Sequence, residues 1–332
     1  MLADDLMITG SMGFGKLMHH TKGKISASHK YVLDAPFAAA ADALSADYGT
    51  LVRAFPFCRL PFEQTWFEVA QSHRPQFCSA GIHAPQFQSK PRRVGFLCSA
   101  TRNDLSAWKA HLFWVLPEIG CSAAGYAMQF DMTQGAATVY NTEVNNPLGS
   151  KHREFFTDSG LKEHPGWVSA GPSVRQALMQ HTNIVVPDYG LPLVPEELML
   201  RPQAEQDKIF SVIDELARSD WAGEVSFLLA VIGLLNARNV VERERVDLSR
   251  KNKARVKRGR RPFMEHSVLK IHRGQIKRAA AGQPSGTGHG PIRYHVCSGH
   301  FKVRKTGIFF WKPFWRGDPK RGTVTHDYEV VS

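Results

Sequence analysis

The chain has 332 residues and a mass of 37.1 kDa, which is enough for one large domain or two ordinary ones. Its 43% hydrophobic, 10% aromatic and 22% charged residues are typical of globular proteins and exclude a disordered chain, a collagen and a coiled coil. No stretch approaches the roughly 18 consecutive apolar residues of a transmembrane helix, so the sequence predicts no membrane partner.

The cysteines and the first residues indicate the cellular compartment. The five cysteines include no Cys-x-x-Cys pair, which is typical of reduced thiols and argues against a structural zinc site. Asp4 and Asp5 stand where a secretory signal carries basic residues. We therefore expect a cytoplasmic protein that binds no metal and no cofactor.

The positive charge is concentrated in the last quarter of the chain. The net charge is +12, yet residues 248–332 hold 20 lysines and arginines against 4 acids, a net charge of +16. Residues 1–247 carry the remaining −4. A basic segment on a mildly acidic body is typical of proteins that contact a polyanion. A solubilising tail has the same charge, but the aromatic residues and histidines of this segment favour contact with a polyanion.

In chain order, the sequence predicts a flexible N-terminus, a helix and then a sheet. Residues 1–33 are rich in Gly, Lys and His, and we expect them to be poorly ordered. The run 34–55 has high helix propensity, with Asp34 as the N-cap and Pro36 in the first turn. Between 65 and 140, short runs of β-formers alternate with turn residues. They predict an antiparallel meander with one face buried and the other partly in contact with water.

The rest of the chain is expected to return to helices and to end in strands. Residues 141–202 are polar with scattered Pro and Gly, which predicts a long irregular insertion. Residues 203–241 predict buried helices, because their second half is apolar on nearly all sides. The body then spans 34–247, and 248–332 form a basic, β-rich C-terminal region. The predicted fold class is α+β, an antiparallel sheet packed with helices.

Glu68 interrupts an otherwise apolar strand of the predicted meander. Residues two apart in a strand point to the same face, so Glu68 shares its face with Trp66. We interpret Glu68 as a solvent-facing residue; a buried acid with hydrogen-bond partners and a working carboxylate are the alternatives. His111, on another predicted strand, is a candidate neighbour.

The basic C-terminal region holds the densest group of candidate binding residues. Seven of the eleven residues from Lys251 to Arg261 are basic, and an extended chain places His300, Lys302 and Arg304 on one face. Cations contact phosphates, and aromatic rings stack on bases; alternatively, the rings fill the core of a small β-unit. We expect one continuous surface whose nucleic-acid-binding residues are Lys251, Lys253, Arg255, Lys257, Arg258, Arg260, Arg261, Lys302, Lys305, Trp311, Trp315 and Arg316.

The same region supports an enzymatic hypothesis. His300 would move the 2′-hydroxyl proton of RNA, and His295 would supply the second acid–base group. Arg304 and Lys302 would stabilise the charge on the pentavalent phosphorus. These residue types predict a metal-independent ribonuclease with His300, His295 and Arg304 as its catalytic residues.

Three stretches carry a resemblance to known proteins. They are Arg59-Leu-Pro-Phe-Glu-Gln-Thr-Trp-Phe-Glu, Asn252-Lys-Ala-Arg-Val-Lys-Arg-Gly-Arg-Arg-Pro-Phe, and Gly299-His-Phe-Lys-Val-Arg-Lys-Thr-Gly-Ile-Phe-Phe-Trp with a following Arg316-Gly-Asp. They resemble a group of uncharacterised bacteriophage and prophage proteins that has no known activity, so no catalytic residue is transferred. This chain departs from the group's pattern at Ser298, where a basic residue is expected. The resemblance implies a phage-encoded intracellular protein.

These observations favour a cytoplasmic phage protein that binds DNA or RNA through its basic, aromatic-rich C-terminal region. One alternative is the ribonuclease described above. The other is an interaction protein that inhibits a host or nucleoprotein machine by docking its cations on an acidic host protein. The polar stretch 141–202 suits that last role, because long loops often carry recognition. The sequence leaves open whether the chain is an enzyme.

Overall fold

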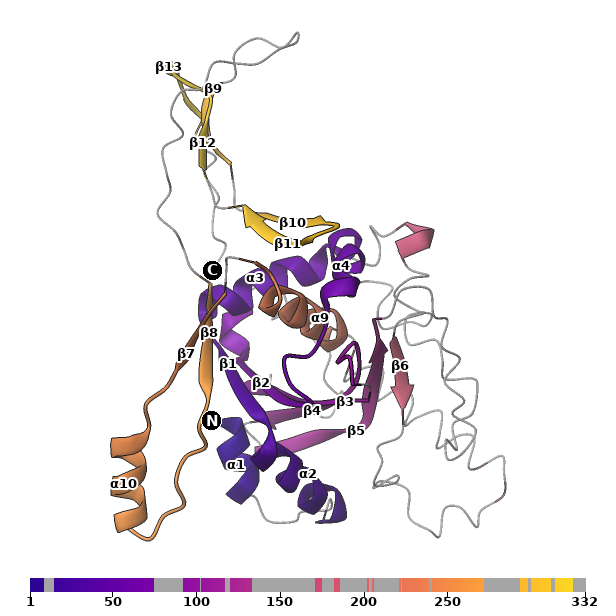
Figure 1. Ribbon diagram of the computed structural model, residues 1–332, viewed down its shortest axis with the longest axis vertical. Helices are drawn as coiled ribbons and strands as arrows, with labels where there is room; N and C mark the ends of the chain where they lie inside the picture. Colours follow the sequence, from indigo (N-terminus) through magenta and orange to yellow (C-terminus); the bar gives the residue numbers. More distant parts are fainter. Residues whose placement is uncertain are drawn as a thin grey trace.

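The computed structural model describes residues 1–8, 15–74, 92–101, 103–116, 120–132, 171–174, 182–185, 202, 205, 221, 223–238, 241–271, 293–297, 300–311 and 314–324. Helices pack around one large, mostly antiparallel sheet, which confirms the predicted α+β class (Figure 1). The helices are α1 (Leu2–Ile8), α2 (Gly15–Ala27), α3 (Ala35–Ala46), α4 (Tyr48–Ala54), η1 (Phe55–Phe57), η2 (Gln71–His73), α9 (Glu224–Leu235) and α10 (Ser249–Lys257). None of the helices in these ranges is long and apolar enough to cross a membrane.

The main sheet has eight strands in the order β6-β5-β4-β3-β2-β1-β8-β7. Its strands are β1 (His29–Leu33), β2 (Gln64–Ala70), β3 (Arg93–Ala100), β4 (Ala107–Leu116), β5 (Gly120–Asp131), β6 (Thr182–Val185), β7 (Val241–Arg245) and β8 (Ser267–Ile271). Strands β2 to β6 pair antiparallel in chain order, which confirms the predicted meander over β2–β5. β6 extends it inside the range predicted to be an irregular insertion, most of which lies outside the described residues.

Strand β1 joins the two halves of the main sheet. It lies between β2 and β8 and runs parallel to both. On the far side of β8, β7 pairs antiparallel and forms the edge of the sheet. The basic C-terminal quarter is therefore connected to the body by a strand ladder.

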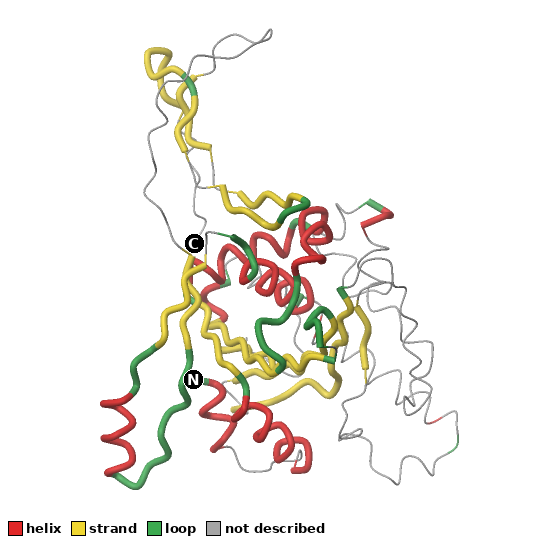
Figure 2. The backbone as a smooth tube through the Cα atoms, viewed as in Figure 1, coloured by secondary structure: helices red, strands yellow, loops and turns green. Residues whose placement is uncertain are grey.

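Helices cover both faces of this sheet (Figure 2). On one face, α3, α4 and α9 pack against rings such as Phe67 and Phe96. On the other face, α1 and α2 cover Trp66 and Phe113. The prediction of a partly wet face is wrong, because β2 and β3 are buried on both sides. Gly95 is required here, since a Cβ atom would lie 2.4 Å from Cζ2 of Trp66.

The N-terminal residues are more ordered than their composition suggests. The sequence predicts a flexible segment over 1–33, yet its described part forms α1, α2 and β1. A few apolar side chains account for the difference, because Leu2, Leu6 and Ile25 are fully buried against the sheet. Strand β1 is also hydrogen-bonded to a neighbour on each side.

The single helix predicted over 34–55 is divided into α3 and α4. Asp34 accepts a hydrogen bond from the Phe37 N–H at 2.8 Å, which confirms the predicted N-cap. Asp47 causes the division: its own N–H donates to the Leu44 carbonyl, and its carboxylate caps α4 at the Thr50 N–H. Aspartate favours such local bonds over helix interiors.

The apolar helix α9 confirms the buried helix expected in the second half of 203–241. All of its residues are buried, whereas 206–220 lie outside the described residues. At its first turn, Glu224 accepts two hydrogen bonds from Nη1 of the fully buried Arg74, at 2.8 and 2.7 Å. The same guanidinium lies 3.8 Å over the ring of Phe227, and its Nε is 3.8 Å from the Asp42 carboxylate. This ion cluster connects η2, α3 and α9.

Two smaller sheets form the C-terminal end of the described chain. A hairpin of β10 (His300–Arg304) and β11 (Gly307–Trp311) packs on the helix layer through the fully buried Ile308. The second sheet contains β9 (Arg293–Cys297), β12 (Phe314–Arg316) and β13 (Asp318–Val324) and stands further out (Figure 1). The chain end, where the sequence also predicts a strand, lies outside the described residues from position 325 onward.

We expect Arg74→Met to lower the free energy of unfolding by about 3–5 kcal/mol, because Glu224 and Asp42 then stay buried without their counter-charge. Urea denaturation measures this loss, and the additional change Glu224→Gln should recover part of it. Arg250→Met, at an exposed position, serves as the control and should change stability by less than about 0.5 kcal/mol. A loss below about 1 kcal/mol in Arg74→Met would show that the cluster does not stabilise the helix layer.

Candidate nucleic-acid interface

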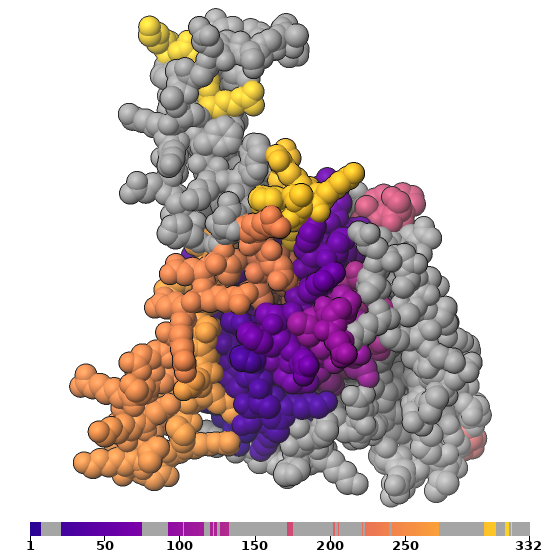
Figure 3. Space-filling model, in the orientation of Figure 1, coloured from indigo at the N-terminus to yellow at the C-terminus, as the bar shows by residue number. Residues whose placement is uncertain are grey.

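The basic residues of the C-terminal region are divided between two places. One group lies on α10 and the turn after it, which project from the β7–β8 edge of the sheet (Figure 3, orange). The other lies on the β10–β11 hairpin, which packs against the helix layer, away from α10 (Figure 1). The expectation of one continuous surface is wrong, because β8 and the segments that follow it belong to different sheets.

The first group forms a structured unit, which we call the basic arm and define as residues 249–263. Its helix starts at Ser249, whose N–H donates to the Asp247 carboxylate at 2.9 Å. The Ser249 side chain and N–H also hold the pKa of Asp247 below its ordinary value. The helix ends at Lys257, and Gly259 lies in the turn after it, where its φ of +64° lets the Arg260 N–H donate to the Arg255 carbonyl.

Side chains fix the return of the arm against its own helix. Asn252 donates to the Phe263 carbonyl at 3.0 Å and accepts from the Phe263 N–H at 2.8 Å. The guanidinium of Arg255 lies 3.9 Å over the Phe263 ring, and its Nε donates to the Arg261 carbonyl. These contacts hold the return segment against α10. They replace core packing there, since α10 has no buried residue.

Eight cations occupy the arm and stay accessible. Arg255 is half-buried, and the other seven are exposed: Arg250, Lys251, Lys253, Lys257, Arg258, Arg260 and Arg261. None of the eight forms an ion pair with an acid in the described ranges. By contrast, two cations of the adjacent β7–β8 ladder are paired with acids, Arg245 with Glu265 and Lys270 with Glu244. Within the described part of the structure, the arm is therefore a positive surface that no acid neutralises.

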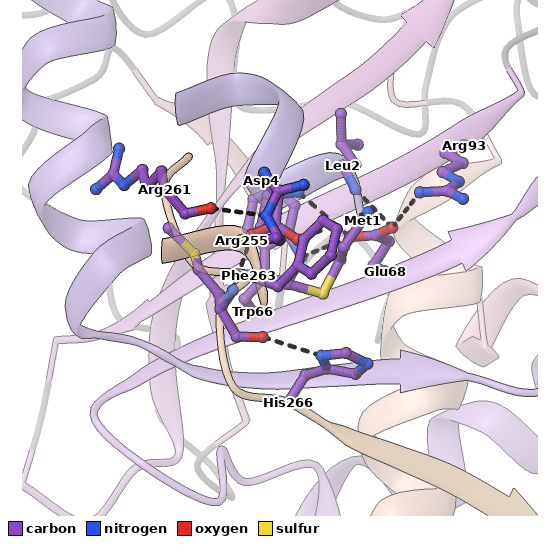
Figure 4. Close-up of polar contacts among 12 residues, drawn as sticks. Met1, Leu2, Asp4, Trp66, Glu68, Arg93, Arg255, Arg261, Phe263 and His266 are labelled. Atoms are coloured by element: carbon purple, nitrogen blue, oxygen red, sulfur yellow. Dashed lines mark hydrogen bonds and ion pairs between the residues drawn. The ribbon is translucent and has the colours of Figure 1, made fainter. Parts of the chain in front are cut away.

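The root of the arm is attached to helix α1. The Met264 N–H donates to the Asp4 carboxylate at 2.8 Å, and Met264 packs against the cluster of Leu2, Trp66 and Phe113. Figure 4 shows Asp4 beside Arg255 and Phe263 of the arm, and Glu68 beside Met1 and Leu2 at the start of α1. The orientation of α1 therefore helps to set the orientation of the arm.

Glu68 holds the start of α1. Its carboxylate accepts hydrogen bonds from the Leu2 N–H at 2.7 Å and the Trp66 indole N–H at 3.3 Å, and Arg93 lies 3.4 Å away. Glu68 is 3% exposed, so the solvent-facing interpretation is wrong and the alternative of a buried acid with partners is confirmed. Burial raises the pKa of Glu68, and these donors partly offset the rise. His111 is on the same face of the sheet as Glu68. It pairs across the strands with Leu97, and Leu97 pairs with Trp66, so His111 is not directly opposite Glu68.

The β10–β11 hairpin carries three residues of the second predicted group. Residues 300–304 form a strand, as expected, and Lys302, Arg304 and Lys305 are exposed. Arg316 is exposed on β12, in the separate three-stranded sheet. The side chains of Trp311 and Trp315 lie outside the described part of the structure.

The residues of the ribonuclease hypothesis are not assembled by the described backbone. His295 pairs with Arg316 in the three-stranded sheet, whereas His300 pairs with Trp311 in the hairpin. Both histidine side chains lie outside the described residues. Glu68 is on the opposite face of the main sheet from the hairpin and does not reach it. The described ranges contain no group of three His, Cys, Asp or Glu that could hold a metal ion.

Sequence reasoning missed a basic pocket between the hairpin and the helix layer. Arg53 and Arg59 line it together with Arg304 and Lys305. The two arginines are more than 240 positions away from the hairpin residues in the chain. Only the packing of the hairpin on α4 and η1 brings the four cations together, so no local sequence signal could have found this group.

Comparison with models of protein families, with curated proteins and with solved structures finds no match for this chain. The geometry described above is therefore the basis for any assignment of function.

We expect Glu68→Gln to remove a pH dependence of stability. Because the pKa of Glu68 is raised, the folded protein keeps a proton that the unfolded chain releases between the ordinary and the raised value. Stability of the wild type should fall as pH rises through this window, and the variant should lack that part of the slope. Urea denaturation at several pH values from 4 to 8 measures it, and identical slopes in both proteins would contradict this role.

Proposed function

We propose that the protein binds nucleic acid through the basic arm, with duplex DNA as the preferred form. The setting we propose is the cytoplasm of a host cell, in keeping with the resemblance to phage proteins. The observation that carries the proposal is the arm itself: eight cations on an exposed, internally braced helix and turn, with no acid among them. Such a segment adds nothing to a core and creates a local field that attracts phosphates.

The dimensions of α10 support a groove as its binding place. Nine residues of helix are about 13 Å long, and a helix with its side chains is about 10–12 Å across. The major groove of DNA is about 12 Å wide and accepts a helix, whereas the major groove of duplex RNA is deep and narrow. Duplex DNA is therefore the better match.

The chemistry of the arm favours phosphate contact over base reading. Asn252, the residue type best suited to read adenine, already uses both its donor and its acceptor on Phe263. The other polar side chains of the arm are mainly lysines and arginines, which contact the phosphate backbone of a nucleic acid whatever its base sequence. Binding should accordingly show little sequence preference and a strong dependence on salt.

Fluorescence anisotropy with a labelled 20-base-pair duplex, measured at roughly 50 to 200 mM NaCl, tests the proposal. The affinity should fall steeply with salt, by about 0.9 logarithmic units per tenfold salt increase for each phosphate contacted. The variant Lys251→Gln/Arg258→Gln should bind more weakly at low salt and lose about 0.9 of the slope per contact removed.

Arg245→Gln/Lys270→Gln is the matched control, because it removes two positive charges beside the arm that Glu265 and Glu244 already neutralise. Its affinity and salt slope should stay close to those of the wild type. Equal losses in both double variants would indicate an effect of net charge alone and contradict binding by the arm. Failure of the wild type to bind at low salt would reject the proposed function.

A further inference from the structure

A pocket beneath the β10–β11 hairpin combines positive charge with an apolar lining. Its volume is about 870 Å³, within the range of pockets that hold small organic ligands. Nine described residues line it: Arg53 of α4, Pro56 and Phe57 of η1, Arg59, Ser106 before β4, Met132 after β5, and Val303, Arg304 and Lys305 of the hairpin. Four of the nine are cations, and none of the nine is an acid.

Hydrogen bonds from Asn236 and Trp108 hold the lower wall of the pocket in place. Asn236, directly after α9, donates from Nδ2 to the carbonyls of Phe57 and Arg59, at 3.0 and 2.7 Å. The Trp108 indole N–H donates to the carbonyl of Cys58, between them, at 3.3 Å. These bonds fix the turn that carries Phe57 and Arg59, so a ligand would meet a preformed surface.

The upper wall is fixed by the packing of the hairpin. Ile308 is fully buried in the main core, next to Gly233 of α9. The Arg238 N–H donates to the Ile308 carbonyl at 3.0 Å and extends the pairing beyond β11. The exposed residues Arg304 and Lys305 therefore line the pocket together with Arg59.

The lining defines the chemistry of a ligand. Several cations without an acid among the described lining residues favour a ligand with more than one negative charge, and arginine is suited to phosphate oxygens. The half-buried Phe57 and Val303 and the buried Met132 offer an apolar surface beside the cations. A phosphate chain attached to a flat aromatic ring satisfies both parts, because rings stack on aromatic side chains.

We propose that this pocket binds a nucleotide, with its phosphates on Arg59, Arg304 and Lys305 and its base against Phe57 and Val303. The nucleotide is a free nucleoside triphosphate or the 5′-phosphorylated end of a strand, which present the same chemistry. The inference does not depend on the basic arm, because none of the described residues that line the pocket belongs to it.

Isothermal titration of the full chain with ATP and, separately, with sodium pyrophosphate tests the inference. ATP should bind saturably at one site, and Arg59→Gln/Lys305→Gln should weaken binding of both ligands by about tenfold or more. Phe57→Leu should weaken ATP by about fivefold or more and leave pyrophosphate unchanged. Arg245→Gln/Lys270→Gln, with the same loss of charge elsewhere, should bind both ligands like the wild type.

The two sources of the nucleotide are separated with the arm variant Lys251→Gln/Arg258→Gln as background. In that protein, the affinities of ATP and of a tetranucleotide with and without a 5′-phosphate are compared. If the phosphorylated tetranucleotide binds more tightly than both ATP and its unphosphorylated form, the ligand is a strand end. If ATP binds more tightly than the phosphorylated tetranucleotide, the ligand is a free nucleotide. Lack of saturable ATP and tetranucleotide binding overturns the inference and, if duplex binding persists, leaves the proposed function intact. Pyrophosphate that binds as tightly as ATP overturns the assignment of a nucleotide.

Discussion

The buried carboxylate of Glu68 connects the core of the protein to its most exposed part. It holds the first backbone N–H groups of α1 and the indole of Trp66 on one face of the main sheet. Helix α1 in turn holds the return of the basic arm through Asp4 and Met264. With the parallel β1–β8 ladder, this contact makes the arm a fixed extension of the sheet instead of a tail. A preformed arm loses less conformational entropy on binding than a disordered basic segment would.

Two separate sets of cations give the molecule two distinct positive surfaces. The arm is convex and is braced by its own side chains. An exposed cationic segment of this shape suits contact with a long polyanion such as a nucleic-acid duplex. The pocket under the hairpin is concave, partly apolar and built from four segments of the chain, which suits a small ligand. The net charge of +12 alone does not show that the cations are divided between these two surfaces.

Local signals in the sequence predicted the elements that depend on neighbours in the chain. Period-two β-formers predicted β2–β5, Asp34 the start of α3, and the apolar run the buried α9. Features that depend on distant contacts could not be predicted this way. Glu68 reads as solvent-facing until α1 is placed over it, and the pocket exists only because the hairpin packs on α4 and η1. Composition likewise predicted a flexible N-terminus, because three buried apolar side chains leave little trace in a polar segment.

The most direct test of the account is the reactivity of individual lysines towards an acetylating reagent, measured by mass spectrometry with and without duplex DNA at low salt. If the preformed arm is the surface that meets phosphates, DNA should slow acetylation of Lys251, Lys253 and Lys257 several-fold. Lys320, exposed in the distant three-stranded sheet, should react at the same rate in both conditions. Arm lysines that react as fast with DNA as without it, or equal slowing of Lys320, would contradict the account.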